Sequence, residues 1–300
     1  MDLTQVALSA HGREVTLKLI AGDHVTKSIL TTSDFYERPL LDDIMRRTQP
    51  EDMVVDLGAY VGTHTTFLAA VAELRIIAVE PNPLSADLLQ QNIDLNHISD
   101  LVELHRVAVG SEEGFGELVT RDEHNLGMTA IKEGDGDVSI QTLDRLVAER
   151  DVAAIKIDVE GMEPQALEGA LDTIARSRPA IYVEVANLVM ERTLLAVLRP
   201  LDYRFVREFN ATPTQLFLPT EHVAPTLYPE SLAEQASEQA YALADALKAV
   251  NTLARRVDAM RLSMNQLARH LAKIEESSLN EATQTSEGAG EPTAVDPEED

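Results

Sequence analysis

An apolar run that ends in an acid and then breaks at a glycine constrains the fold of this chain more than any other stretch. The run is VVDLGAYVGT (54–63), and helical spacing begins after its second glycine. About one strand further along comes IIAVEP (76–81), a second apolar run that also ends in an acid, Glu80. Acid-capped strands on either side of a glycine turn indicate an open α/β sheet, in which ligands bind beyond the carboxyl ends of the strands.

The glycine turn and the second acid predict a pocket for a nucleoside. Gly58 lets the backbone turn tightly where a side chain would block a ligand. Glu80 follows about twenty residues later, where an acid accepts hydrogen bonds from ribose hydroxyls. An ordinary strand–turn–helix, in which both acids are only solvated caps, is the simpler alternative for this motif alone.

The spacing of the glycines favours S-adenosylmethionine over a dinucleotide. A dinucleotide site uses three glycines and places the pyrophosphate on the helix N-terminus, whereas Gly58 and Gly62 form a Gly-x-x-x-Gly pattern with no third glycine. Asp56 also stands where it would repel phosphate. An anionic pocket suits a cation, and S-adenosylmethionine carries a sulfonium and an ammonium group. An oxidoreductase that uses a dinucleotide is therefore the less favoured enzyme.

Charge and cysteine content disfavour several other classes of protein. The formal net charge is -26, so nucleic acid phosphates and anionic lipid surfaces are disfavoured as partners. The chain has no cysteine, which excludes disulfides, thiolate catalysis and cysteine metal sites and is compatible with the reducing cytoplasm, where we expect the protein. No apolar stretch is long enough to span a bilayer, and the N-terminus does not resemble a signal peptide.

From residue 51 onward, strands alternate with helices. The expected strands are nearly continuously apolar and rich in β-branched residues, as in a parallel sheet covered on both faces. They are Met53–Leu57, Arg75–Val79, Val102–Val109, Ala154–Val159 and Ala180–Val185. The expected helices are Thr63–Ala72, Leu84–Asn96, Pro164–Arg176 and Leu188–Leu198. The alternation predicts right-handed crossovers and a doubly wound, mostly parallel sheet within a domain of residues 51–220.

Residues 1–50 are expected to cap this domain. Val6–Leu8 and Val15–Leu19 alternate apolar and polar residues on either side of a His-Gly pair, which predicts a β-hairpin. Leu40–Thr48 has the apolar spacing of a helix and ends near a proline.

Two further strand pairs are expected later in the chain. Phe115–Arg121 and Val138–Thr142 are expected to form an inserted hairpin. Tyr203–Phe209 and Gln215–Leu218 are expected to finish the large sheet as an antiparallel pair.

The sequence changes character after Pro229. Apolar or small residues recur at heptad spacing, which predicts a coiled-coil helix over residues 230–275 and a homo-oligomer formed through it. The two series are Ala236, Leu243, Val250, Val257, Met264, Leu271 and Ala246, Leu253, Met260, Leu267, Ile274. A long amphipathic helix that folds back on the domain is the alternative. Residues 276–300 are rich in Glu, Ser, Thr, Gly and Pro, and we interpret them as a disordered acidic tail.

Ionisable residues cluster at the end of the fourth strand, where Lys156, Asp158 and Glu160 are expected on one side of the strand. Such groups at the end of a buried strand are unfavourable unless they are paired or used. Pairing of Lys156 with Asp158 is the purely structural interpretation. The fifth strand adds another acid at its own carboxyl end. Acids from four strands are therefore expected to converge on one edge of the sheet: Asp56, Glu80, Asp158 and Glu184.

Taken together, these motifs resemble the FkbM-type S-adenosylmethionine-dependent methyltransferases. The matching motifs are DLGAYVG (56–62), EPNP (80–83), AVG (108–110), TLD (142–144), KIDVEGME (156–163), LEGA (167–170) and PAIYVE (179–184). The upstream segment Phe35-Tyr36-Glu37 matches as well, so the resemblance extends from Phe35 to Leu218, and KIDVEG is its most specific part. One position departs from the pattern, because the family usually has asparagine where this chain has Tyr60.

The resemblance implies a Rossmann-like class I methyltransferase fold and methylation of a hydroxyl group on a sugar, a glycolipid or another natural product. It implies S-adenosylmethionine as the cofactor and a small-molecule or glycan acceptor. The residues expected at the cofactor are Glu37 at the ammonium group, Asp56, the turn residues Gly58, Ala59, Tyr60 and Gly62, Glu80 at the ribose, Asn82 near the adenine, and Asp158 at the methionine end.

A base or a metal ion is expected to assist as the hydroxyl proton leaves. We rank Asp158 and Glu160 first as the base, then Glu184, and then His124, which stands in a polar loop. His64 is better explained by packing. Carboxylates also bind divalent cations, but the spacing requires none and no metal is predicted. The alternative outside enzymology is a catalytically silent, methyltransferase-like scaffold that oligomerises or binds partners through the coiled coil.

Overall fold

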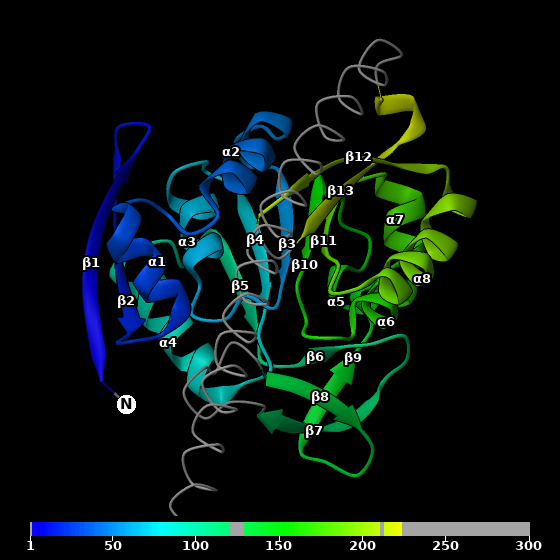
Figure 1. Cartoon of the computed structure of the whole chain (residues 1–300), viewed down its shortest axis with the longest axis horizontal. Coiled ribbons are helices and arrows are strands. Elements are labelled where there is room, and N and C mark those ends of the chain that lie inside the picture. The colour runs from blue at the N-terminus through cyan, green and yellow to red at the C-terminus, as the bar shows by residue number, and fades with distance from the viewer. Residues whose placement is uncertain (1, 121–128, 211–212, 224–300) are drawn as a thin grey trace, which may run out of the picture. The chain divides into compact units, whose positions relative to one another are not determined.

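A seven-stranded sheet forms the centre of the computed structural model, which describes residues 2–120, 129–210 and 213–223 (Figure 1). The strand order is β12-β13-β11-β10-β3-β4-β5. The strands are β3 (Met53–Leu57), β4 (Arg75–Val79), β5 (Val102–His105), β10 (Ala154–Ile157), β11 (Ala180–Glu184), β12 (Tyr203–Phe209) and β13 (Thr214–Pro219). Neighbours from β11 to β5 pair in parallel, whereas β13 is antiparallel to both β11 and β12. The mostly parallel sheet and the late antiparallel pair are thus confirmed.

The strand order reverses between β3 and β10, and this reversal determines where a ligand can bind. From β3 the chain builds outward through β4 and β5, and it later adds β10 and β11 on the other side of β3. In such sheets the crevice outside the carboxyl ends of the strands at the reversal is the ligand site. The glycine turn after β3 and the acids after β10 both lie at this crevice.

Helices cover both faces of the sheet and bury one hydrophobic core on each. The first core contains α2 (Arg38–Arg47), α3 (Thr63–Ala70) and α4 (Pro83–Leu95). The second core contains α5 (Leu143–Val147), α6 (Glu163–Glu168), α7 (Leu171–Ser177) and α8 (Leu188–Leu198). The two sets lie on opposite sides of the sheet in Figure 1. Successive side chains of β3 point to opposite faces of the sheet, so Val54 packs in the first core and Val55 in the second.

The N-terminal hairpin forms as predicted, with β1 (Leu3–Ala10) antiparallel to β2 (Arg13–Ile20). Its buried face joins the first core. Asn92 of α4 and Asn96, which follows the last residue of α4, hold the hairpin in place. Each hydrogen-bonds both the N–H and the C=O of a β2 residue at 2.7–2.9 Å. Helix α1 (His24–Thr32), which the sequence analysis did not predict, follows the hairpin and is capped by the Asp23 side chain.

The strand expected over Val102–Val109 is wrong in its second half. β5 ends at His105 because its partner β4 ends at Val79, and the chain then enters a separate four-stranded sheet of order β6-β9-β7-β8. The strands of this small sheet are β6 (Ala108–Val109), β7 (Gly114–Thr120), β8 (Thr129–Glu133) and β9 (Val138–Gln141). The two strands expected as an inserted hairpin do pair antiparallel, as β7 and β9. They are not a hairpin, because the chain forms β8 between them and β8 pairs with the other side of β7.

The single helix expected over Pro164–Arg176 is also wrong, because the structure divides it into α6 and α7 at Gly169. A Cβ on Gly169 would lie 2.1 Å from the carbonyl oxygen of Gly110, so the turn there packs tightly against the residue that follows β6. The Asp144 carboxylate accepts hydrogen bonds from the N–H groups of Asp172 and Thr173, which caps α7 as a separate helix.

The chain divides into two units, residues 1–235 and 236–300. The predicted coiled coil over residues 230–275 and the predicted tail over 276–300 lie outside the described residues and stay predictions. None of the helices in the described ranges combines the length and apolar character needed to cross a membrane.

Candidate active site

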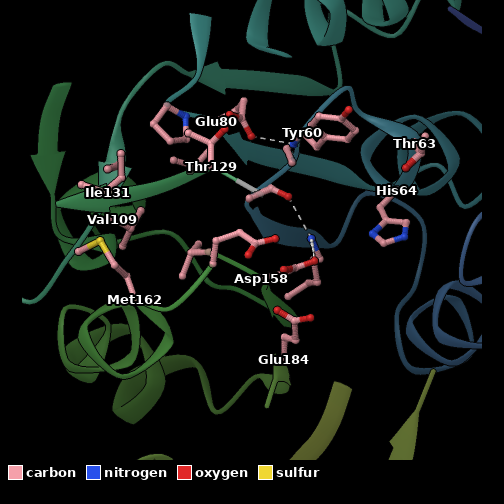
Figure 2. A pocket seen from close by; sticks show the side chains of 18 of the residues that line it. Tyr60, Thr63, His64, Glu80, Val109, Thr129, Ile131, Asp158, Met162 and Glu184 are labelled. Atoms are coloured by element: carbon pink, nitrogen blue, oxygen red, sulfur yellow. Dashed lines mark hydrogen bonds and ion pairs between the residues drawn. The ribbon is translucent and has the colours of Figure 1, made fainter. Parts of the chain in front are cut away.

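A cavity of about 540 Å³ opens at the carboxyl ends of β3, β4, β10 and β11 (Figure 2). Carboxylates predominate among the titratable side chains that line it. These side chains are His24, Tyr36, Glu37, Tyr60, His64, Glu80, Lys156, Asp158, Glu160 and Glu184. Because the described lining carries more acids than bases, it favours a ligand with positive charge.

The glycine turn after β3 is held in place by backbone hydrogen bonds. The N–H groups of Gly58 and Ala59 both donate to the carbonyl oxygen of Val79 at 3.0 Å. Gly58 has φ +76°, and a Cβ there would lie 1.7 Å from the carbonyl oxygen of Asp158. Tyr60 also has a positive φ, +51°, a conformation that asparagine adopts more readily than tyrosine. Only glycine fits at the first of these positions, where the loops after β3 and β10 touch.

Glu80 links this turn to the start of α4. Its Oε2 accepts the N–H of Tyr60 and its Oε1 the N–H of Asn82, both at 2.8 Å. Only 7% of Glu80 is exposed, and burial raises its pKa to about 7 against the opposing effect of the two donors. Each carboxylate oxygen has a second lone pair, so Glu80 can still accept hydrogen bonds from hydroxyls in the cavity.

Asp56 does not line the cavity. It lies inside β3 with its side chain fully buried, where Thr65 of α3 donates to Oδ2 at 2.7 Å. The Lys156 Nζ lies 3.3 Å from Asp56 Oδ1 and 3.5 Å from Asp158 Oδ2, and it donates to the carbonyl oxygen of Gly58 at 3.1 Å. Burial disfavours both ions, yet their attraction lowers the pKa of Asp56 and raises that of Lys156.

Asp158 and Glu184 stand beside one another at the ends of β10 and β11 (Figure 2). Burial together with the charge of Asp158 raises the pKa of Glu184 to about 9. Glu160 follows at a left-handed position, φ +54°, and it also lines the cavity. Two of the candidates for the base, Asp158 and Glu184, therefore lie next to one another.

A third group of side chains comes from the segment before α2 and from α3. His64 is buried and the Glu37 side chain is 14% exposed, and His64 Nε2 lies 3.4 Å from Glu37 Oε2. The rings of Tyr36 and His64 stack with their centroids 5.9 Å apart. Burial raises the pKa of Glu37 to about 7, and burial with the Lys156 charge lowers the pKa of His64 to about 4. The imidazole is therefore neutral at pH 7. His64 packs against Tyr36 and also lines the cavity.

The opposite wall of the cavity is apolar. Val109, Ile131 and Met162 lie together there, away from Glu184 (Figure 2). They come from β6, β8 and the turn before α6. No sequence signal distinguishes them from core residues, so the sequence analysis did not find this wall.

Most of the predicted site residues meet at the cavity. Those that line it are Glu37, Gly58, Ala59, Tyr60, Glu80, Asp158, Glu160 and Glu184. Gly62 instead precedes α3 at φ +83° and packs on Leu89. Asn82 caps α4 and donates to Thr129 of the cavity wall. His124 lies outside the described residues. Within those residues, no group of three or more His, Asp or Glu side chains is placed to hold a metal ion.

Comparison with known proteins gives one family. The sequence model of the family described as "Methyltransferase FkbM domain" matches residues 56–205, half of the chain. No curated protein matches.

Solved structures of several methyltransferases resemble parts of the chain. The FkbM methyltransferase from Methylobacillus flagellatus KT is 20% identical over 57% of this chain and 44% of that chain, with a TM-score of 0.44. A putative rRNA-methylase from Clostridium thermocellum is 12% identical over 61% of this chain and 93% of its own, with a TM-score of 0.43. M. jannaschii TYW2 in complex with AdoMet is 15% identical over 72% of this chain and 85% of its own, with a TM-score of 0.39. The chain thus spans less than half the length of the Methylobacillus flagellatus protein.

Proposed function

The chain belongs to the FkbM methyltransferase family, and from this membership we propose that it is an S-adenosylmethionine-dependent O-methyltransferase. The proposed acceptor is a hydroxyl group of a sugar, a glycolipid or another natural product. The observation that carries the proposal is the acid-lined cavity beyond the strand reversal, with Glu80 buried at the end of β4.

The residues present fit the cofactor. Its sulfonium and ammonium groups are cations, and carboxylates from three strand ends and from the segment before α2 line the cavity. Lys156, the one lysine or arginine among the described lining residues, is already engaged by Asp56 and Asp158. The wall formed by Val109, Ile131 and Met162 suits a flat apolar group such as a purine.

Each part of the lining has a proposed role in binding. Glu80 accepts hydrogen bonds from the ribose hydroxyls, and the backbone of Gly58, Ala59 and Tyr60 borders the cofactor. Glu37 accepts a hydrogen bond from the ammonium group, and Asp158 lies at the methionine end. Three further residues support these contacts from outside the cavity. Asp56 pairs with Lys156, Gly62 precedes α3, and Asn82 donates its N–H to Glu80.

The bound cofactor supplies a methyl group on a positively charged sulfur. The protein orients the acceptor hydroxyl toward that group and excludes water, which converts a bimolecular step into one within a complex. A neutral hydroxyl is a weak nucleophile, and its proton must leave as the new bond forms. Asp158, Glu160 and Glu184 are the described carboxyl groups in position to receive it, and His124 stays a further candidate from the sequence.

We propose the remaining properties from the sequence. The acceptor is a small molecule or a glycan and not a nucleic acid, because the chain carries a formal net charge of -26. A homo-oligomer through residues 230–275 and a cytoplasmic location are proposed on the heptad pattern and on the absence of cysteine.

Calorimetric titration of the full chain with S-adenosylmethionine and S-adenosylhomocysteine tests the cofactor. We expect both to bind and both to bind about tenfold to a hundredfold more weakly to Glu80→Ala, because hydrogen bonds to a charged group contribute about 1.5–3 kcal/mol. Glu149→Ala, which removes an exposed carboxylate after α5, is the matched control and should bind as the wild type does. Thermal denaturation of each variant checks that it is folded.

The same titration distinguishes the proposed enzyme from the alternative of a catalytically silent scaffold. A catalytically silent scaffold has no affinity for either ligand, so the absence of binding by a folded wild-type chain would refute the proposal. If the ligands bind, transfer of a labelled methyl group to panels of sugars, glycolipids and polyketide-like alcohols identifies the acceptor class.

A further inference from the structure

Asp158 and Glu184 place two carboxyl groups beside one another in the cavity. Both residues stand at the carboxyl ends of neighbouring parallel strands, where the register of Ile157 against Val183 sets them side by side. Figure 2 shows the two side chains next to one another, and both line the cavity. Two ionised carboxylates repel one another, so a pair in this position favours a proton on one of them.

The surroundings of the pair explain why the proton stays. Three further acids face it: Glu160 and Glu163 from the turn after β10 and the start of α6, and Glu37 from the segment before α2. Tyr36 and His64 also face it and are neutral at pH 7. Lys156 is the facing cation, and it is shared with buried Asp56. Burial and the charges of Asp158, Glu160 and Glu163 raise the pKa of Glu184 to about 9, so one proton is present at neutral pH.

We propose that the Asp158–Glu184 pair releases its proton when the cationic cofactor binds and takes up the proton of the acceptor hydroxyl as the methyl group is transferred. The inference rests on the proposed function and extends it, because it gives the two carboxyl groups a joint role in place of a single base. The pair lines the cavity, and the Asp158 side chain is 37% exposed, so both a ligand and a departing proton can reach it.

The charges in the cavity balance through this cycle. In the transfer step the acceptor's O–H bond breaks, an O–CH3 bond forms and the S–CH3 bond breaks, with its electron pair returning to sulfur. The sulfur loses its positive charge in the same step in which the pair gains a proton. The summed charge of the pair, the cofactor and the acceptor is therefore the same before and after transfer. The buried side chains of the lining, among them Glu80 and Lys156, favour such a step, since uncompensated charge is strongly disfavoured beside them.

Proton release on binding can be measured without turnover. We would titrate the full chain at about pH 8 with S-adenosylmethionine and, separately, with its neutral product S-adenosylhomocysteine, in two buffers with different ionisation enthalpies. A cation within about 4–6 Å lowers a carboxyl pKa by about 1 to 3. The sulfonium ligand should therefore release about half a proton to one proton more than the thioether. Glu184→Gln should lose this additional release. Subtracting the proton release of the variant from that of the wild type cancels any contribution from the ligands' own titrating groups.

A second readout keeps the inference testable if Glu184→Gln does not fold. Between about pH 7 and 9, the wild type should bind S-adenosylmethionine up to about tenfold more tightly per pH unit relative to S-adenosylhomocysteine. Glu168→Gln, an exposed carboxylate of α6, is the control and should behave as the wild type. Equal proton release for the two ligands with parallel pH dependences would overturn the inference and leave the proposed function intact. Failure of both ligands to bind would overturn the proposed function itself.

Discussion

Replacing Lys156 by methionine tests whether the buried ion pair holds the floor of the cavity in place. Only 4% of Lys156 is exposed, and Asp56 is fully buried. Lys156→Met leaves the Asp56 carboxylate without a cation in the first core, and it removes the donor to the carbonyl oxygen of Gly58. Removing one partner of a buried pair lowers the free energy of unfolding by about 3–5 kcal/mol. For a domain of this size, we expect the melting temperature to fall by roughly 6 to 20 °C.

The double variant separates the loss of the pair from the loss of the side chain. Asp56→Asn removes the unpaired charge and keeps an oxygen for the Thr65 hydroxyl. Asp56→Asn/Lys156→Met should therefore be more stable than Lys156→Met alone, although it lacks both ions. Urea denaturation followed by circular dichroism measures the four free energies of the double-mutant cycle.

An exposed ion pair provides the control. Arg75 Nη2 lies 2.6 Å from Glu51 Oε2, and the two side chains are 52% and 62% exposed. Arg75→Met should lower the free energy of unfolding by at most about 1 kcal/mol, because water screens such pairs. A loss below about 1 kcal/mol for Lys156→Met, or a double variant no more stable than Lys156→Met, would contradict the assignment of the pair as a buried support.

Three further perturbations follow from the same contacts. Gly58→Ala should lower the free energy of unfolding by more than Gly22→Ala in urea titrations, because both residues have a positive φ but only at Gly58 does a Cβ meet backbone. Glu184 has a folded-state pKa raised from 4.5 to about 9, so its contribution to stability is complete below pH 4.5 and is lost as the pH rises to about 9. Glu184→Gln should reduce that loss in denaturation at pH 5 and pH 9. Leu253→Lys/Leu267→Lys in the full chain should convert the predicted oligomer to a monomer in light scattering, and an unchanged mass would count against the coiled coil.

The sequence predicted the elements whose pattern is local. β3, β4 and α8 have the predicted bounds, because apolar runs and helical spacing mark them without reference to the rest of the chain. The N-terminal hairpin and the late antiparallel pair were found for the same reason. The errors in the predicted bounds occur where a distant part of the chain determines where a strand or helix ends. The end of β5 depends on the end of β4, and the break between α6 and α7 depends on Asp144 of another helix.

The sequence predicted the site residues that belong to a recognisable motif. It did not predict those that reach the cavity only through the tertiary arrangement. Glu80, Asp158 and Glu184 each end a recognisable strand, so their convergence follows from a parallel sheet. Val109 and Ile131 reach the cavity because the small sheet packs against its rim. Their sequence surroundings are those of ordinary strands, and only the tertiary arrangement gives them a place in the lining.

Asp56 and Glu80 show how one position in a strand decides between support and binding. Both residues follow an apolar run and precede a turn, so the sequence analysis placed both at the cofactor. Asp56 lies within β3, where its side chain is held on the sheet face beneath α3 and pairs with Lys156. Glu80 follows the last residue of β4, so it turns out of the sheet and reaches the cavity. The predicted bounds of both strands are correct, so the difference was already present in them: Asp56 lies before the end of β3, and Glu80 lies after the end of β4. The acid that binds is therefore the one that stands beyond the hydrogen-bonded ladder, whereas the acid inside the ladder must find a cation within the core.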